Sequence, residues 1–97
     1  MHVLAVVYDL HIPGSRSLKE RRSVLRPVVS GVSRRFGVSV AETGRTDLWQ
    51  RAEIGVAVVS GQSSQCLTLA DEVDRYMWSI PEIEVVSSSN HWLNTEE

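Results

Sequence analysis

The fold is decided by residues 2–36, HVLAVVYDLHIPGSRSLKERRSVLRPVVSGVSRRF, which have the pattern of a strand, a short turn and a long helix. Over residues 2–12 the apolar side chains recur at every second position, which is the period of a strand with one apolar face. These side chains are Leu4, Val6, Tyr8, Leu10 and Ile12. Pro13-Gly14 then ends the strand, because both residue types favour turns.

A capping box marks the start of the helix. Ser17 and Glu20 have the spacing at which a serine hydroxyl and a glutamate carboxylate each accept a hydrogen bond from a backbone amide near the helix start. Apolar residues then recur at helical spacing, so the helix is predicted to run to about Phe36, where Gly37 is suited to end it. Pro27 lies inside this helix and predicts a kink.

The remaining elements follow from the same two periods of apolar residues. They are strands over 38–43 and about 49–60, a second helix that Ser63 or Ser64 is expected to cap and that Pro81 ends, and a strand that begins near Ile83. The serine run at 87–90 favours a strand only weakly, so the length of the last strand stays open. The tail from about Asn94 is expected to be loose.

The order strand-helix-strand-strand-helix-strand predicts an α+β fold, the ferredoxin-like βαββαβ sandwich. Its four-stranded antiparallel sheet carries two helices on one face, and its first and third strands are central. The sequence holds no linker that would separate two domains, so residues 1–97 are interpreted as a single ferredoxin-like domain.

Composition places the chain among ordinary globular proteins, with 42% hydrophobic and 23% charged residues. Cys66 is the single cysteine, which excludes a disulfide framework and a cysteine-built zinc site, and it is expected to be a small buried group on a helix. No apolar run reaches the roughly 20 residues that span a bilayer, and residues 3–7 lack the flanks of a signal peptide. We therefore expect a cytoplasmic protein without membrane contact, cofactor or metal.

Charge is distributed very unevenly along the chain. Seven of the ten basic residues lie between Arg16 and Arg35. Residues 1–40 carry seven Lys and Arg against two acidic residues, a net charge of +5, whereas residues 41–97 carry three Arg against ten acidic residues, a net charge of −7. A basic segment in an otherwise acidic chain favours a polyanionic partner.

The predicted first helix concentrates these cations on its outer face. A row of cations on one helix can neutralise phosphates and release their counterions, which gives sequence-independent, salt-sensitive binding. The candidate nucleic-acid-binding residues are Arg16, Lys19, Arg22, Arg26 and Arg34. A solvated face that keeps a small protein soluble explains the same charges. Arg21 falls within the apolar stripe, so its side chain must reach outward or meet a partner at the edge of the sheet.

Aromatic residues that stack on bases do not accompany these cations in the sequence pattern. RNA-recognition motifs share this fold, but they stack bases on aromatic residues of the central strands. Residues 51–59 of the third strand contain no aromatic residue, and Tyr8 of the first strand has the parity of the core. Sequence-specific recognition of single strands on the sheet is therefore not expected.

Three short motifs resemble the YlxP-like family of small bacterial proteins, whose function is unknown. They are HIPG at 11–14, SLKE at 17–20 and DLWQRA at 47–52, and the similarity extends from Met1 to about Val86. The resemblance implies a ferredoxin-like fold. It also implies a gene setting of translation initiation and ribosome maturation, and hence RNA or a ribosomal subunit as partner. The family has no established catalytic residues, so the resemblance implies none here.

A second candidate site comes from the pairing of the first and third strands. Antiparallel pairing of these neighbours gathers four polar residues at one corner of the helix-free face, with Glu42 expected near them. They are Asp9, His11, Arg51 and Glu53. Such a cluster suits anion binding or acid–base chemistry, and its spacing matches no recognised metal site. A cross-strand ion-pair network explains the same residues.

The rest of the helix-free face is small and apolar, which suits a homodimer or a protein partner through that face or through an edge strand. The residues concerned are Val3, Ala5, Val7, Gly55, Ala57 and Val59. Exposure of Trp49, Trp78 or Trp92 would add to this interpretation. Three functions follow: an RNA- or ribosome-associated binding module is favoured, a protein-interaction or homodimerisation module is the alternative, and an enzyme using the polar corner has the least support.

Overall fold

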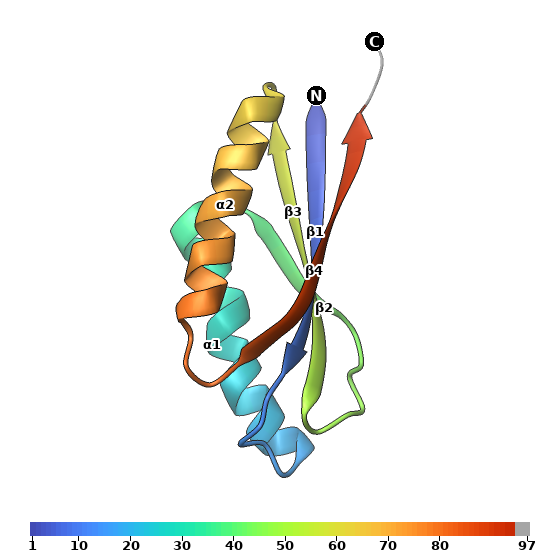
Figure 1. Cartoon of the computed structure of the whole chain (residues 1–97), viewed down its shortest axis with the longest axis vertical. Coiled ribbons are helices and arrows are strands. Elements are labelled where there is room, and N and C mark those ends of the chain that lie inside the picture. The colour runs from blue at the N-terminus through green and yellow to red at the C-terminus, as the bar shows by residue number, and fades with distance from the viewer. Residues whose placement is uncertain (95–97) are drawn as a thin grey trace.

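The computed structural model describes residues 1–94 and shows one open sheet with both helices packed on the same face (Figure 1). The elements are β1 (His2–His11), α1 (Leu18–Phe36), β2 (Ser39–Gly44), β3 (Arg51–Ser60), α2 (Ser63–Ser79) and β4 (Glu84–Asn94). The strands follow the order β2-β3-β1-β4, and every neighbouring pair is antiparallel. The predicted ferredoxin-like fold, with β1 and β3 at the centre, is confirmed.

The core lies between the sheet and the two helices. Even-numbered residues are buried over residues 4–10 of β1 and 52–58 of β3, and the register joins Leu4 to Val58 and Tyr8 to Ile54. The period of two in the sequence therefore marks the helix-facing side of the sheet, as predicted. The helices close the core with Leu25, Val28 and Val32 from α1 and with Cys66, Ala70, Val73 and Met77 from α2.

Local signals set both ends of α1. The Ser17 hydroxyl accepts a hydrogen bond from the Glu20 amide at 3.1 Å, and the Glu20 carboxylate accepts one from the amide of Arg16 at 2.6 Å. Gly37 has a φ of 64°, a left-handed conformation that favours glycine, and its amide donates to the Ser33 carbonyl at 3.0 Å. The serine half of the predicted capping box and the glycine stop are thus present, whereas the Glu20 carboxylate binds the amide one residue before the N-cap. The helix α1 continues through Pro27.

The start of α2 differs from the prediction. Gln62, and not a serine, occupies the N-cap, and no side chain there accepts a hydrogen bond from the first turn. The Gln62 amide is itself held by the Ser60 hydroxyl at 3.1 Å. Neither Ser63 nor Ser64 caps the helix, because both already lie inside it. This helix therefore depends on the packing of its apolar face more than on capping.

The length of β4 is decided by its partner strand. The serine run at 87–90 pairs with β1 without a break, and β4 extends to Asn94, opposite His2. One register shift occurs opposite Asp9 and Leu10. Weak strand propensity is overridden here because β1 offers a full edge of backbone hydrogen-bonding groups. Asn94, expected in a loose tail, belongs to β4, and the rest of that tail lies outside the described residues.

A hydrogen bond between two side chains links the centre of the sheet to α2. The Tyr8 hydroxyl donates to the Asp74 carboxylate at 3.1 Å. Burial raises the pKa of Tyr8 above its usual value, and the Asp74 charge and this hydrogen bond raise that pKa further. The contact therefore stabilises the fold below the ordinary tyrosine pKa of about 10, and its contribution is lost as the pH rises above that value.

Candidate nucleic-acid interface

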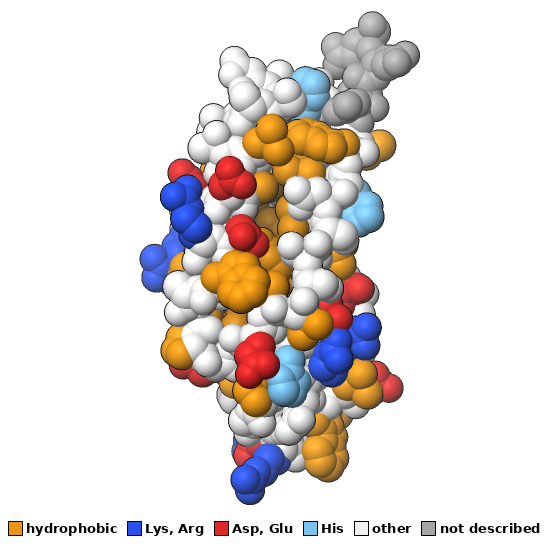
Figure 2. Space-filling view, in the orientation of Figure 1, with side chains coloured by type: hydrophobic (Ala, Val, Ile, Leu, Met, Phe, Trp, Pro, Cys, Tyr) orange, Lys and Arg blue, Asp and Glu red, His pale blue; other side chains and the backbone are white. Residues whose placement is uncertain are grey.

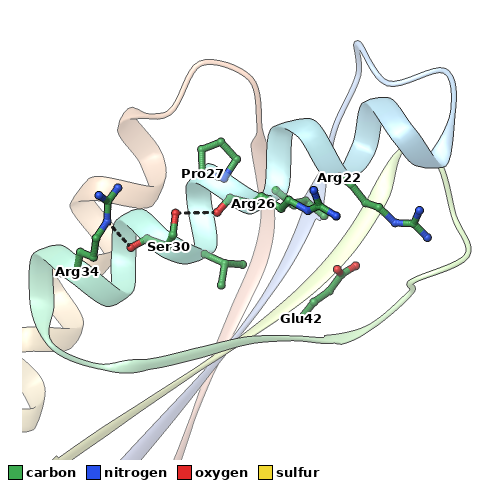
Figure 3. A pocket seen from close by; sticks show the side chains of 8 residues that line it. Arg22, Arg26, Pro27, Ser30, Arg34 and Glu42 are labelled. Atoms are coloured by element: carbon green, nitrogen blue, oxygen red, sulfur yellow. Dashed lines mark hydrogen bonds between the residues drawn. The ribbon is translucent and has the colours of Figure 1, made fainter.

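A groove of about 840 Å³ runs between α1 and β2, and arginines of α1 form one wall (Figure 3). Its lining residues are Arg22, Leu25, Arg26, Pro27, Val29, Ser30, Arg34 and Glu42. The guanidinium groups provide positive charge, and the apolar side chains exclude water from part of the surface. This groove is therefore a cationic surface that also contains apolar side chains.

The arginines of the groove form a stripe along one side of α1. Arg22, Arg26, Ser30 and Arg34 follow one another at intervals of four residues, so each is a neighbour of the next and the row winds gradually around the helix. At about 1.5 Å of rise per residue the stripe spans about 18 Å. The Arg34 Nε donates to the Ser30 carbonyl at 3.3 Å, and the Ser30 hydroxyl donates to the Arg26 carbonyl at 3.0 Å (Figure 3).

These three arginines have no ion-pair partner among residues 1–94. The ion pairs found there belong to His11, Arg21, Arg45 and Arg51. Glu42 is the acidic residue of the groove, and its carboxylate is held by Arg21. Because Arg21 neutralises Glu42, the positive charge of the stripe remains available to an external anion.

Arg21 is the buried member of the basic set, with 1% of its surface exposed. Its Nη2 donates to the Glu42 carboxylate and, at 3.0 Å, to the Arg45 carbonyl, and its Nε donates to the Arg51 carbonyl at 3.0 Å. The expectation that Arg21 meets a partner at the edge of the sheet is confirmed. The side chain joins the first turn of α1 to both ends of the β2–β3 connection.

The other predicted basic residues occupy the N-terminal end of α1 and do not line the groove. Arg16 and Lys19 are exposed, and the groove is lined from Arg22 onward. Arg35, which the sequence prediction left out, lies 4.7 Å from the ring centre of Tyr76 and so joins α1 to α2. On a helical wheel, Arg35 lies near the side of α1 that faces α2. The position of Tyr76 then shows that the Arg35 side chain contacts this ring and does not line the groove.

The polar corner of the helix-free face forms as two separate sets of contacts. Asp9 and Arg51 meet at 2.6 Å, and the Nε of Arg45 lies 3.4 Å from the second Asp9 oxygen. His11 and Glu53, although opposite Arg51 and Asp9 in the register, turn toward the edge strands. The His11 Nδ1 lies 3.1 Å from the Glu84 carboxylate, and Glu53 accepts from the Thr43 hydroxyl at 2.8 Å.

The corner therefore resembles the ion-pair network that the sequence analysis kept as an alternative. Arg45 joins this network from the β2–β3 connection, where its backbone has a left-handed φ of 58°. A single left-handed residue that is not glycine has no clear sequence signature, so this contact could not be predicted from the sequence. Glu42, expected near this corner, instead faces α1 and binds Arg21. Among residues 1–94 no group of three or more His, Cys, Asp or Glu side chains could hold a metal ion.

The helix-free face holds a shallow apolar groove of about 440 Å³ over β1, β2 and β3. Ala5 and Val7 of β1 and Gly55 and Ala57 of β3 contribute to its floor. The small apolar character predicted for this face is thus present. The three tryptophans are all exposed, at 57% for Trp49, 64% for Trp78 and 43% for Trp92.

Fold and surface together define a small ferredoxin-like protein with an open sheet and a basic first helix. Residues 3–90 match the family described as "Protein of unknown function (DUF503)". The chain is also 36% identical over 87 residues to the "Uncharacterized protein YlxP" of Bacillus subtilis (strain 168), a match that covers 90% of this chain and 89% of that protein. The chain belongs to this family, which confirms the resemblance drawn from the short motifs.

Solved structures support the fold alone. A de novo designed protein, Foldit4, aligns with a TM-score of 0.55 over 99% of this chain and 100% of its own length, at 10% sequence identity. Such low identity concerns the arrangement of the backbone and not the chemistry of the surface. Neither helix of the described residues combines the length and the apolar character that a membrane crossing requires.

Proposed function

We propose that this protein is a non-enzymatic RNA-binding module that holds structured RNA, such as ribosomal RNA or a ribosomal subunit, on the basic face of α1. One observation carries the proposal: Arg22, Arg26 and Arg34 line a single groove, and no carboxylate of the described chain pairs with any of them. If these arginines served only to keep the protein soluble, they would not need to line the same groove.

The physical basis of the proposal is counterion release. Each phosphate neutralised by an arginine frees condensed cations, so a stripe of arginines gains affinity that falls with added salt. Arginine also binds phosphate oxygens through two parallel hydrogen bonds, which lysine does not. The stripe along α1 contains arginine at each of its three cationic positions, which suits this mode of binding.

The remainder of the chain favours one docking orientation. Residues 41–97 carry a net charge of −7, which repels phosphate from the surfaces that they form. RNA is therefore expected to meet the protein on the α1 side. The gene setting implied by the family resemblance, translation initiation and ribosome maturation, supports RNA as the polyanion.

The test compares two charge reversals that change the net charge equally. Arg26→Glu lies in the groove, and Arg75→Glu lies on the exposed side of α2. We expect Arg26→Glu to weaken binding to a structured ribosomal RNA fragment by about tenfold or more and to lower the salt slope by about one. Arg75→Glu is expected to have a much smaller effect. Affinity is measured by fluorescence anisotropy at several salt concentrations, and circular dichroism verifies that each variant is folded.

Two results would contradict the proposal. Equal losses in both variants would mean that net charge, and not the groove, determines the affinity. An absence of binding by the wild-type protein even at low salt would leave α1 as a solvated surface.

A second candidate function, self-association through β4, rests on the character of that edge. β4 pairs with β1 on one side only, and residues 85–93 contain no Asp, Glu, Lys or Arg. Val86, Trp92 and Leu93 are exposed on this strand. The upper part of β4 shows hydrophobic and uncharged side chains (Figures 1 and 2). Protein edge strands usually carry charges or bulges that prevent pairing. β4 has one register shift near its start, but residues 87–94 pair with β1 without a break and carry no Asp, Glu, Lys or Arg.

If β4 pairs with β4 of a second copy, lysines on its exposed edge will separate the two copies. We expect the double variant Ser88→Lys/Asn90→Lys to raise the dimer dissociation constant by more than about tenfold, because like charges then face each other across the pair. Ala57→Asp, on the helix-free face, serves as the control and should remain dimeric. Light scattering coupled to size exclusion measures the mass. Dissociation by Ala57→Asp alone would place the interface on the sheet face, and a monomeric wild type would reject this candidate.

A further inference from the structure

The connection between β2 and β3 is held firmly against the start of α1. The buried Arg21 guanidinium donates to the carbonyls of Arg45 and Arg51, at the two ends of this connection. The Gln50 side chain donates to the carbonyls of Pro13 and Ser15, at 3.3 and 3.1 Å. Residues 45–50, which we name the pinned loop, therefore have a defined position beside the N-terminal end of the basic helix.

The pinned loop presents an aromatic side chain to solvent. Trp49 is 57% exposed, and its neighbour Leu48 is exposed as well. Among residues 1–94, the aromatic and cation–π contacts found involve Phe36, Tyr76 and Arg35, and none involves Trp49. An indole that served only to close the core would be largely buried. The Trp49 ring is instead available to an external flat partner.

Cations surround the base of this loop. Ser15, which accepts from Gln50, directly precedes Arg16, and Arg16 and Lys19 are exposed beside it. The Glu20 carboxylate is occupied by the Arg16 amide, and Asp47 is the exposed acidic residue of the loop itself. The arginine stripe of the groove begins at Arg22, one turn further along α1. The loop that carries the exposed Trp49 is thus held next to the N-terminal end of the basic helix.

We propose that Trp49 stacks on an unpaired RNA base whose neighbouring phosphates lie on the basic face of α1. This inference rests on the proposed function and narrows its substrate to RNA that has an unpaired nucleotide beside a structured region. Stacking on an aromatic side chain contributes about 1–3 kcal/mol per base and requires no particular base. A continuous duplex offers no such base face, because its bases are stacked on one another.

The proposal goes beyond the sequence analysis, which considered stacking aromatics only on the central strands. Trp49 does not lie on the central strands, where RNA-recognition motifs place their aromatic residues. In the sequence it comes well after the end of α1. Only the contacts of Arg21 and Gln50 bring it beside α1.

The experiment uses Trp49 fluorescence in the full chain with Trp78→Phe and Trp92→Phe, which removes the other two indoles. The probes are an RNA hairpin with an unpaired loop and a fully paired RNA duplex of equal length and charge. We expect the hairpin to quench Trp49 emission and the duplex to leave it unchanged. In the wild-type background, Trp49→Ala should lower hairpin affinity by about tenfold and leave duplex affinity and the salt slope unaltered.

Two matched variants complete the design. Trp49→Phe keeps an aromatic ring and should restore most of the hairpin affinity, whereas Trp78→Ala, an equally exposed tryptophan on α2, should have no effect. Equal, salt-sensitive binding of both RNAs with unchanged Trp49 emission would overturn the stacking inference while the proposed function stands. A complete absence of RNA binding at low salt would overturn both.

Discussion

Glu42→Ala is expected to lower the free energy of unfolding by about 3 kcal/mol, because it leaves the buried Arg21 guanidinium without its carboxylate. Arg21 is 1% exposed, so its guanidinium depends on hydrogen-bond partners within the protein. The carbonyls of Arg45 and Arg51 still accept hydrogen bonds from it, which places the loss at the lower end of the range for a broken buried ion pair.

Urea denaturation of four variants tests this expectation: Glu42→Ala, Arg21→Met, the double variant of these two, and the control Glu53→Ala. Glu53→Ala removes another β-sheet carboxylate, one that accepts a single hydrogen bond from Thr43, and should cost no more than about 1 kcal/mol. The double variant Arg21→Met/Glu42→Ala removes both charges and should lose less than the two single changes together. A loss in Glu42→Ala no greater than that in Glu53→Ala would show that the Arg21–Glu42 pair does not stabilise the fold.

Met77→Ala is expected to destabilise the protein by about 3 kcal/mol, through lost apolar burial and the cavity left behind. Met77 is 0% exposed and is the last buried residue of α2. This helix has no side-chain cap, no acidic residue in its first turn and no basic residue in its last turn. Apolar packing is therefore the principal interaction that holds α2 to the sheet.

The neighbouring residue provides the control. Trp78 is a larger side chain than Met77, yet it is 64% exposed, so Trp78→Ala should change the unfolding free energy by about 0.5 kcal/mol or less. Met77→Leu, which keeps most of the apolar volume, should cost less than about 1.5 kcal/mol. A large loss in Trp78→Ala would show that this side chain packs against the protein in solution.

Much of the fold could be predicted because its signals are local. The alternation from Leu4 to Ile12 depends only on the pleat of one strand, and the Ser17–Glu20 cap depends on four consecutive residues. The strand formed by the serine run of β4, in contrast, could not be predicted from local signals. Its own propensity is weak, and it forms a strand because β1 provides the hydrogen-bonding edge.

The features of the candidate site also fall into two groups, those that the local sequence predicts and those that depend on distant residues. The basic character of α1 and the outward position of Arg26 and Arg34 follow from helical spacing alone. That Glu42 is neutralised, that Arg45 approaches Asp9 and that Trp49 lies beside the basic helix depend on residues distant in sequence. No periodic pattern within a short stretch of sequence predicts such contacts.

The sequence by itself determined the order of elements, the buried faces of β1 and β3 and the concentration of positive charge on one helix, because each depends on residues within a few positions of one another. Only the tertiary structure decided which arginines of α1 have no carboxylate partner among residues 1–94 and which one is buried. A side chain at the border of an apolar stripe, such as Arg21, is directed by the carboxylate and carbonyls that the sheet places beside it. Those partners come together only when β2, β3 and α1 pack.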